Sequence, residues 1–346
     1  MLGAFPTIPD PEHAMSALRS RLTGLGFHVP PRTVTNHDLE SLMDTSDAWI
    51  VERTGIRERH FVDPGTGSSD LGTEAARRAL ADAGRTAADV DFVIFATTTP
   101  DYMFPGNGVL VQQQLGLGTV GALDVRNACS GFLYGLSVAD AFVRMGRYRC
   151  VLVIGAEVQS TGLDLSTRGR DMAVLFGDGA GAAVVEPCEA PRGILSWALH
   201  SEGALARELW CEAPTSREAG RVTPEMLAAG RQYPQMNGRQ VFKNATTRFP
   251  EVIQEVLADS GHTLDEVDLI VPHQANRRIG DAVAERLGVP SERVFQNIER
   301  YGNTTAASIP IALTEARDAG RIRDGDIVVL AAFGAGFAWA ACALRW

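Results

Sequence analysis

One cysteine stands in surroundings that could activate it as a nucleophile. Cys129 lies in the segment NACSGF, after a β-like ALDV and before an apolar stretch with helical spacing. A cysteine at the amino end of a helix is exposed to the positive end of the helix dipole, which favours the thiolate. Its small neighbours leave room for a ligand. Position alone does not separate this role from the inert, buried state of most cysteines.

A histidine and an asparagine could complete such a site. His273 follows the apolar run LIVP in the segment VPHQAN, and residues at the carboxyl ends of strands in α/β folds tend to line the ligand crevice. Its imidazole could accept a proton or donate a hydrogen bond to developing charge. A purely structural histidine is an equally open interpretation. Asn303, in YGNTTAAS, could supply an amide donor without adding charge, although an isolated Asn there would be interpreted as a helix N-cap.

An internal repeat is the most informative feature of the chain. Residues 79–94 (ALADAGRTAADVDFVI) and 256–271 (VLADSGHTLDEVDLIV) are identical at seven of sixteen positions. Both indicate a helix, a glycine cap, a loop and a buried strand. The agreement in both order and residue type favours duplication over chance similarity.

A second repeated pair connects the candidate residues. GRYR at 146–149 and GRIR at 320–323 are 174 residues apart, and the same offset joins Cys129 to Asn303. Both residues come just before a segment with helical spacing. Equivalent helix ends from two similar halves could therefore face one site.

The elements that must position these residues follow from apolar runs alternating with segments of helical spacing, which is the pattern of an α/β fold. The runs are continuous, as in strands covered on both faces. The expected strands are 92–98, 151–157, 181–186, 269–272 and 327–333, and the expected helices are 70–83, 130–145, 250–260, 278–287 and 304–319. With the repeat, they predict two similar halves, 18–188 and 189–346, after an N-terminal extension at 1–17.

Two glycine-rich turns follow apolar runs. AFGAGF (332–337) could point backbone amides at an oxyanion or simply join two strands. FGDGAG (176–181) has the same character, and the sequence assigns no partner to Asp178. Neither matches GxGxxG or GxxxxGK[ST], so no nucleotide-binding loop is indicated. The uncharged stretch 327–344 is interrupted by glycines, and we interpret it as two buried strands rather than a membrane span.

Composition narrows the classes of function. The chain has 346 residues and a formal net charge of -10, which argues against broad binding to nucleic acid or to an anionic membrane. The five cysteines form no CxxC or zinc-type pair, so we expect neither a disulfide framework nor a metal site. Prolines and acids stand where a signal peptide would have basic and apolar parts, and we expect a cytoplasmic protein.

The motifs taken together resemble β-ketoacyl-acyl carrier protein synthase III, the condensing enzyme of the thiolase superfamily that initiates bacterial fatty acid synthesis. The resemblance covers nearly everything after residue 17. The matching segments are TSDAWIVERTGIRER (45–59), NACSGF (127–132), FGDGAGAAV (176–184), MNGRQVFK (236–243), VPHQANRRI (271–279), YGNTTAASIP (301–310) and AFGAGFAW (332–339). The resemblance implies a thiolase-like five-layered αβαβα sandwich made of two duplicated halves, which also accounts for the repeat.

The resemblance implies a catalytic triad of Cys129, His273 and Asn303. Cys129 would take an acyl group from acyl-coenzyme A, with the amides of Cys129 and Ala335 as the oxyanion hole. Malonyl-acyl carrier protein would then lose carbon dioxide while His273 and Asn303 stabilise the enolate, and the carbanion would attack the acyl-enzyme. The product would be 3-ketoacyl-acyl carrier protein. The resemblance implies no metal or redox cofactor, since coenzyme A enters only as the substrate thioester.

The resemblance also implies contacts with both substrates. The residues implied for coenzyme A, with Arg168 as an alternative to Arg170, are Trp49, Arg53, Arg170 and Arg278. An aromatic ring beside arginines suits stacking on adenine and pairing with phosphates. The residues that could form a basic patch for an acidic carrier protein are Lys243, Arg278 and Arg286.

A homodimer is the further expectation from the resemblance. Buried-type strands such as FVIFATT would pair across a twofold axis in an isologous interface. Phe104, in PDYMFPG, would reach into the acyl pocket of the partner subunit and limit the chain length accepted there. A surface-loop phenylalanine with no effect on selectivity is the alternative.

Three features depart from the family pattern and bear on the acyl group. They are the long segment 203–235, the bulky PDYMFPG and the N-terminal extension. They keep open a related enzyme of secondary metabolism that acts on longer or unusual acyl chains. The order Cys, His, Asn is also that of papain-like proteases, although the CGxCW signature is missing. A non-catalytic acyl-binding protein is a third alternative, which the intact triad disfavours.

Overall fold

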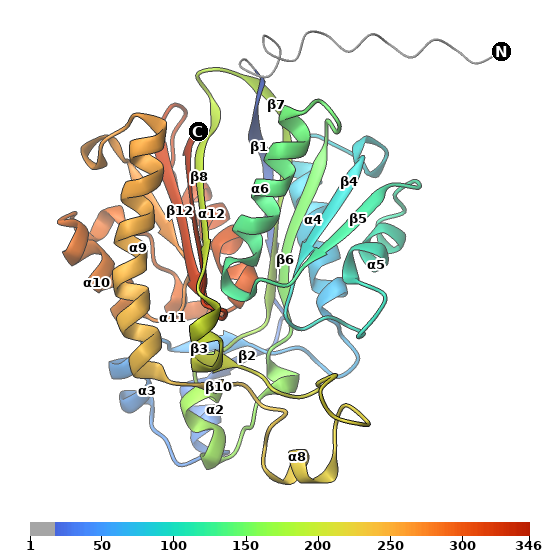
Figure 1. Ribbon diagram of the computed structural model, residues 1–346, viewed down its shortest axis with the longest axis vertical. Helices are drawn as coiled ribbons and strands as arrows, with labels where there is room; N and C mark the ends of the chain where they lie inside the picture. The colour runs from blue at the N-terminus through green and yellow to red at the C-terminus, as the bar shows by residue number, and fades with distance from the viewer. Residues whose placement is uncertain (1–17) are drawn as a thin grey trace.

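The fold contains two mixed β-sheets that flank a pair of central helices (Figure 1). The computed structural model describes residues 18–346, and the expected extension at 1–17 lies outside the described residues. The first sheet has, in spatial order, β1 (Leu18–His28), β7 (Gly179–Glu189), β6 (Val151–Glu157), β4 (Phe92–Ala96) and β5 (Gly121–Val125). The second has β11 (Leu269–Pro272), β12 (Ile327–Gly334), β13 (Ala338–Arg345) and β8 (Gly193–Ser201).

Strand direction differs across each sheet. In the first sheet β4 runs parallel to β5 and β6, whereas β7 is antiparallel to both β6 and β1. In the second, β11 and β12 are parallel, and β13 is antiparallel to β12 and β8. The stretch 327–344 thus forms the two strands β12 and β13, as expected. No helix within residues 18–346 is long and apolar enough to cross a membrane.

The central layer consists of α6 (Gly131–Arg144) and α12 (Ser308–Asp318). Phe132 and Leu136 of α6, with Ile309 and Leu313 of α12, share one buried apolar core with strands of both sheets. The outer helices are α4 (Ser68–Asp82) and α5 (Asn107–Gln114) on the first sheet, and α9 (Gly238–Ser260) and α10 (Arg277–Leu287) on the second. This arrangement confirms the predicted five-layered αβαβα sandwich.

The repeated segments fold alike. In each, an outer helix (α4 or α9) leads through a 3-10 turn to a buried strand (β4 or β11). Thr86 and Thr263 begin the two turns, and the backbone amide and hydroxyl of each donate to a carboxylate three residues later, Asp89 or Glu266. These capping boxes give the identical Thr and the conserved acidic character of the repeat a physical reason.

Short elements gather at one end of the sandwich, where β11 and β12 end (Figure 1). They include two strand pairs and several helices of one or two turns. Their bounds are β2 (Thr33–Thr35), α2 (Asn36–Glu40), α3 (Asp47–Thr54), β3 (Glu58–His60), α7 (Arg170–Ala173), β9 (Leu209–Trp210), α8 (Pro224–Ala228), β10 (Gln235–Met236) and α11 (Ile298–Tyr301). The long segment 203–235 contributes β9, α8 and the start of β10 to this end.

Two expectations about the elements need correction. The helix expected at 250–260 begins at Gly238 and contains Pro250; proline is common in the first turn of a helix, so the sequence places the start too late. The edge strand next to FVIFATT in the first sheet is β5, because β4, which contains most of FVIFATT, is hydrogen-bonded on both sides. Any pairing of sheets between subunits at that edge would therefore involve β5.

Candidate active site

A cavity of about 470 Å³ contains all three residues of the predicted triad. Cys129 lies in the 3-10 turn η2 (Ala128–Ser130), directly before α6. His273 follows β11, and Asn303 stands between α11 and the 3-10 turn η8 (Thr305–Ala307) that leads into α12. The triad thus combines Cys129 from the first half with two residues of the second; Cys129 and Asn303 lie just before the central helices, and His273 lies at the end of β11.

The backbone of the β12–β13 connection closes around Cys129. A Cβ atom added to Gly334 would lie 2.6 Å from Cβ and 2.9 Å from Sγ of Cys129, so only glycine fits there. The backbone amides of Cys129 and Ala335 both act to lower the pKa of the thiol, so they lie where they favour negative charge at Sγ. This position is consistent with the predicted oxyanion hole.

The thiol of Cys129 is protonated at rest, contrary to the expectation of a thiolate at a helix end. Burial raises its pKa to about 12, and the negative charge of Glu157 acts in the same direction. The two backbone amides act in the opposite direction but do not compensate. Desolvation of the charged form therefore outweighs the local helix dipole, and acyl transfer requires a proton acceptor.

His273 is a neutral imidazole. Burial lowers its pKa to about 3. Its Nδ1 lies 2.5 Å from Oγ of Ser308 in α12. Within residues 18–346, its Nε2 is buried and has no hydrogen-bond partner, which leaves this nitrogen for a group in the cavity.

Asn303 is held by its backbone and by one side of its amide. Its N–H donates to the carbonyl of Leu175 at 2.8 Å, and its carbonyl accepts from Gly177 at 3.1 Å. Its Oδ1 accepts from the backbone amide of Thr305 at 2.9 Å. Because Oδ1 is occupied, the amide group Nδ2 is the donor that remains for a ligand.

The mouth of the cavity carries an aromatic ring between two guanidinium groups. Arg53 lies 4.7 Å and Arg170 4.6 Å from the ring centre of Trp49. Arg278, also on the cavity wall, lies 5.8 Å from the ring of Phe242. Arg168, the alternative to Arg170, instead pairs with Asp164 at 2.6 Å. Arg170 is therefore the arginine of that loop that accompanies Trp49.

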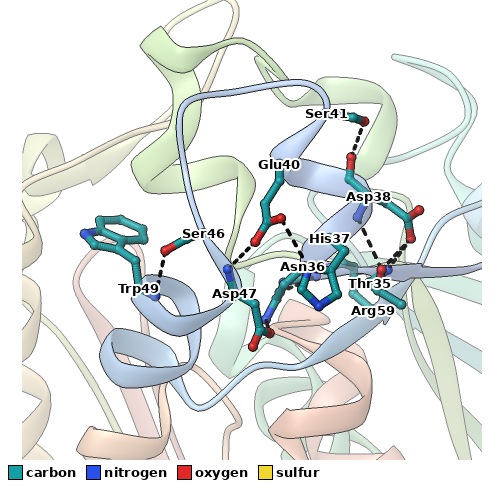
Figure 2. Close-up of polar contacts among 10 residues, drawn as sticks. All are labelled: Thr35, Asn36, His37, Asp38, Glu40, Ser41, Ser46, Asp47, Trp49 and Arg59. Atoms are coloured by element: carbon teal, nitrogen blue, oxygen red, sulfur yellow. Dashed lines mark hydrogen bonds and ion pairs between the residues drawn. The ribbon is translucent and has the colours of Figure 1, made fainter.

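A polar network fixes the segment that presents Trp49 (Figure 2). Ser46 caps α3 by accepting a hydrogen bond from the backbone amide of Trp49 at 3.2 Å. Asn36 donates to Asp47 at 2.8 Å and accepts from the fully buried Arg59 at 2.8 Å. In Figure 2 the Trp49 ring points away from this network. The network thus supports the ring without occupying its faces.

The residues expected to meet a carrier protein lie on the outer helices of the second sheet. Lys243 is exposed on α9. Arg286 on α10 donates to the carbonyl of Thr246 at 2.9 Å and to the hydroxyl of Thr247 at 3.2 Å, so its guanidinium is partly committed to α9. Phe104, between β4 and α5, is 80% exposed. In residues 18–346 there is no cluster of His, Cys, Asp or Glu suited to a metal ion.

Three residues have contacts that the sequence did not reveal. Asp178 does have partners: its carboxylate accepts from the amides of Val62 and Ser160, both at 2.8 Å. Glu157, fully buried at the end of β6, accepts from the hydroxyl of Thr99 at 2.6 Å. Burial raises its pKa to about 7. The sequence signal for Glu157 was an acidic residue at the end of the apolar run VLVIGAE. The third residue, Ser308, contacts His273, and no sequence signal pointed to it.

The layered fold and the buried cysteine at the end of a central helix define a thiolase-type condensing enzyme. Residues 123–203 match the family described as 3-oxoacyl-[acyl-carrier-protein (ACP)] synthase III, and residues 257–346 match its C-terminal counterpart. The chain belongs to this family. A β-ketoacyl-[acyl-carrier-protein] synthase III of Symbiobacterium thermophilum is 49% identical over 325 residues, covering 94% of this chain and 97% of the relative.

Solved structures agree with this assignment. The 3-oxoacyl-[acyl-carrier-protein] synthase III of Aquifex aeolicus VF5 has a TM-score of 0.87 and 43% identity, over 94% of this chain and 100% of that one. The priming β-ketosynthase of the R1128 polyketide biosynthetic pathway has a TM-score of 0.87 and 35% identity, over 94% and 96% of the two chains. The chain is thus an acyl-transferring condensing enzyme of the type that initiates fatty acid or polyketide synthesis. The protease and non-catalytic alternatives are wrong.

Proposed function

We propose that the chain condenses an acyl-coenzyme A primer with malonyl-acyl carrier protein, through an acyl group on Cys129, to give 3-ketoacyl-acyl carrier protein. The meeting of Cys129, His273 and Asn303 in one cavity carries this proposal. Trp49, with an arginine beside its ring, lines the same cavity. The site therefore joins a nucleophile and two polar groups to an entrance suited to a phosphate-bearing nucleotide.

Acylation is the first half-reaction. As Sγ of Cys129 attacks the thioester carbon, its proton passes to Nε2 of His273. The carbonyl oxygen becomes an oxyanion held by the amides of Cys129 and Ala335. The bond between the acyl carbon and the sulfur of coenzyme A then breaks, and coenzyme A leaves with the electron pair and takes the proton from Nε2 of His273.

Condensation is the second half-reaction. The malonyl group loses carbon dioxide, and Nε2 of His273 takes up a proton from water as negative charge develops. The resulting enolate oxygen accepts hydrogen bonds from this Nε2–H and from Nδ2 of Asn303. The carbanion attacks the acyl carbon, and Sγ of Cys129 leaves and regains a proton from His273. Neither half-reaction needs an external oxidant or reductant, so the proposed chemistry requires no redox cofactor. No metal ion takes part in either proposed half-reaction.

The entrance supports the assignment of coenzyme A. Adenine would stack with Trp49 and its flanking guanidinium groups, and the phosphates would pair with arginine. The residues proposed for this binding are Trp49, Arg53, Arg170 and Arg278. An acidic carrier protein would approach the same mouth over Lys243, Arg278 and Arg286, of which Arg286 contributes least because it is partly bonded to α9.

A homodimer is part of the proposal. The free edge strand β5 exposes unpaired backbone groups, and such an edge is commonly covered in a stable protein. Tyr102, Met103 and Phe104 are exposed in the loop after the neighbouring strand β4. We propose an isologous interface here, with Phe104 entering the acyl pocket of the partner subunit. A cytoplasmic location, without nucleic acid or membrane partners, stays a prediction.

The division into two halves supports the same assignment. The strands of the first sheet lie within residues 18–189, and those of the second within 193–345. The central helices α6 and α12 end 174 residues apart, at the offset of the sequence repeat. We infer that 18–188 and 189–346 are the products of a duplication.

Intact-mass analysis with a panel of acyl-coenzyme A donors tests the proposed function. The parent should gain the mass of one acyl group per chain, and Cys129→Ala should gain none. Subsequent addition of malonyl-acyl carrier protein should remove the acyl group and give a 3-ketoacyl product. Condensation by Cys129→Ala, or acylation at another residue, would overturn the assignment.

The same panel of acyl-coenzyme A donors distinguishes a second candidate function from the first. The similarity to a polyketide priming β-ketosynthase and the long segment 203–235 favour a primer other than the shortest acyl groups. A profile that peaks at longer or branched donors would indicate that candidate. A profile that peaks at acetyl-coenzyme A would indicate initiation of fatty acid synthesis.

A further inference from the structure

One tight turn, residues 303–308, holds both catalytic side chains of the second half. Thr305 has a φ of 49°, rare for a β-branched residue. Its amide donates to Oδ1 of Asn303 at 2.9 Å, and its carbonyl accepts from Oγ of Ser308 at 2.7 Å. Oγ of Ser308 in turn lies 2.5 Å from Nδ1 of His273. All four residues are buried.

The direction of these bonds follows from the available protons. A carbonyl oxygen cannot donate, so the single hydroxyl proton of Ser308 goes to Thr305. Oγ then offers only lone pairs to His273, and Nδ1 must carry the ring proton. The neutral ring has one proton, which leaves Nε2 bare. Within the described part of the chain Nε2 has no other partner, so its lone pair is free for the cavity.

We propose that Ser308 is a positioning residue that holds His273 in the Nδ1-protonated tautomer, so that Nε2 is free to accept the proton of Cys129 during acylation. This inference rests on the proposed roles of Cys129 and His273. During acylation the S–H bond breaks and an Nε2–H bond forms. That proton then passes to the sulfur of coenzyme A as its bond to the acyl carbon breaks. During condensation Nε2 takes up a second proton from water and gives it to Sγ as the acyl carbon leaves it. Whenever the ring is doubly protonated, it still donates from Nδ1 to Ser308.

The same turn accounts for the two donors of the second half-reaction. Thr305 occupies Oδ1 of Asn303, which leaves Nδ2 as a donor, and Ser308 occupies Nδ1 of His273, which leaves Nε2 to carry the proton taken from water. The strained conformation of Thr305 directs its amide and carbonyl to these two tasks. Ser308 would thus affect acylation through the state of His273, without contact with the substrate.

The decisive measurement is the tautomer of His273 by two-bond ¹H–¹⁵N correlation, with His273→Gln to assign its signals. The resting parent should show a protonated Nδ1 and a bare Nε2. Ser308→Ala should lose this single state, and Cys129 acylation by an acyl-coenzyme A should slow about 10- to 100-fold. Ser308→Thr, which keeps a hydroxyl, should restore most of the rate.

Thr314→Ala is the matched control, because Thr314 is also buried in α12 and its hydroxyl donates to the carbonyl of Pro310 at 2.7 Å. This variant should acylate within about twofold of the parent. A resting parent with Nε2 protonated would overturn the proposal even if Ser308→Ala fails to fold. Parent-like acylation by Ser308→Ala would also overturn it. Failure of the parent to acylate Cys129 would instead refute the proposed function, since the tautomer is measured without substrate.

Discussion

The turns that lead into the two central helices occupy equivalent places and do different chemistry. Both contain a residue with a positive φ, 45° at Ala128 and 49° at Thr305. Around Cys129 the important neighbours are backbone: two amides favour negative charge at Sγ, and Gly334 lies against it. At the second turn, the backbone and Ser308 instead orient side chains, namely those of Asn303 and His273.

In the proposed mechanism the two turns serve different half-reactions. The first turn presents Cys129 to backbone amides, which suits the oxyanion of acyl transfer. The second presents side-chain groups, one of which can hold a proton, which suits formation of an enolate. Cys129 and His273 are both neutral at rest, since burial raises the pKa of one and lowers that of the other. In the proposed mechanism the reaction therefore starts with transfer of a proton from Cys129 to His273.

The largest expected effect is loss of the nucleophile in the first turn. Cys129→Ser keeps the geometry, but an alcohol is a much weaker acid and nucleophile than a thiol, so we expect acyl transfer to fall at least about a thousandfold. Intact-mass measurements of the acyl-enzyme in samples quenched at successive times check this result. The melting temperature should stay close to that of the parent, because the side chains have similar size. Full acyl transfer by the variant would remove Cys129 from its assigned role.

The second prediction separates the turns by half-reaction. Asn303→Ala should slow malonyl decarboxylation by about 10²–10³, the usual cost of one such donor, and leave acylation of Cys129 nearly unchanged. Carbon dioxide release and acyl-enzyme formation are measured separately. Asn303→Asp is the control for structure, since it keeps an acceptor for the Thr305 amide and replaces the amide donor with a second carboxylate oxygen.

The outcome for His273 should differ from that for Asn303. His273→Ala should lose decarboxylation to a similar degree and lose acylation as well, because no proton acceptor remains for Cys129. Equal losses in both half-reactions for Asn303→Ala would contradict the division of labour between the two turns.

Much of the fold was predictable because its signals in the sequence are local. Continuous apolar runs marked β4, β6, β11 and β12, and the Thr–acid pairs that cap the repeated turns are visible within a few residues. Strand β1 was missed, because LRSRLTGLGFH mixes charges with glycines. Its fit depends on α4: a Cβ on Gly24 would lie 2.3 Å from the carbonyl oxygen of Ala79. Such close approach is a property of the assembled fold.

In the candidate site, too, features set by residues close in sequence could be predicted, whereas features set by residues far away in sequence could not. The residue types of the triad and their places at element ends could be identified from motifs and the repeat. The protonation of Cys129 could not, because burial by distant segments outweighs the helix end beneath it. The contact of Ser308 with His273 joins residues 35 apart in sequence, and only the packing of α12 beside β11 creates it.

A substitution at Gly334 tests the backbone environment of the first turn. Gly334→Ala would place a methyl group 2.6 Å from Cβ of Cys129, so Cys129 or the β12–β13 connection must shift. We expect acylation to fall roughly 10- to 100-fold and stability to fall by about 1–3 kcal/mol. Gly203→Ala is the matched control, since a Cβ there meets nothing within 4 Å. Parent-like acylation by Gly334→Ala would show that the site tolerates this displacement.

The smallest effect is expected on selectivity, at a residue outside both turns. Phe104 is exposed in one protomer, and we propose that its ring enters the acyl pocket of the partner subunit. Phe104→Ala should therefore raise the relative kcat/KM for longer or branched acyl-coenzyme A donors by about tenfold, with some loss of dimer stability because a ring buried at the interface is removed. The measurements are the donor profile of variant and parent and their masses by light scattering. A monomeric parent, or an unchanged profile in a stable dimer, would exclude Phe104 from the pocket and return the gating role to the segment 203–235.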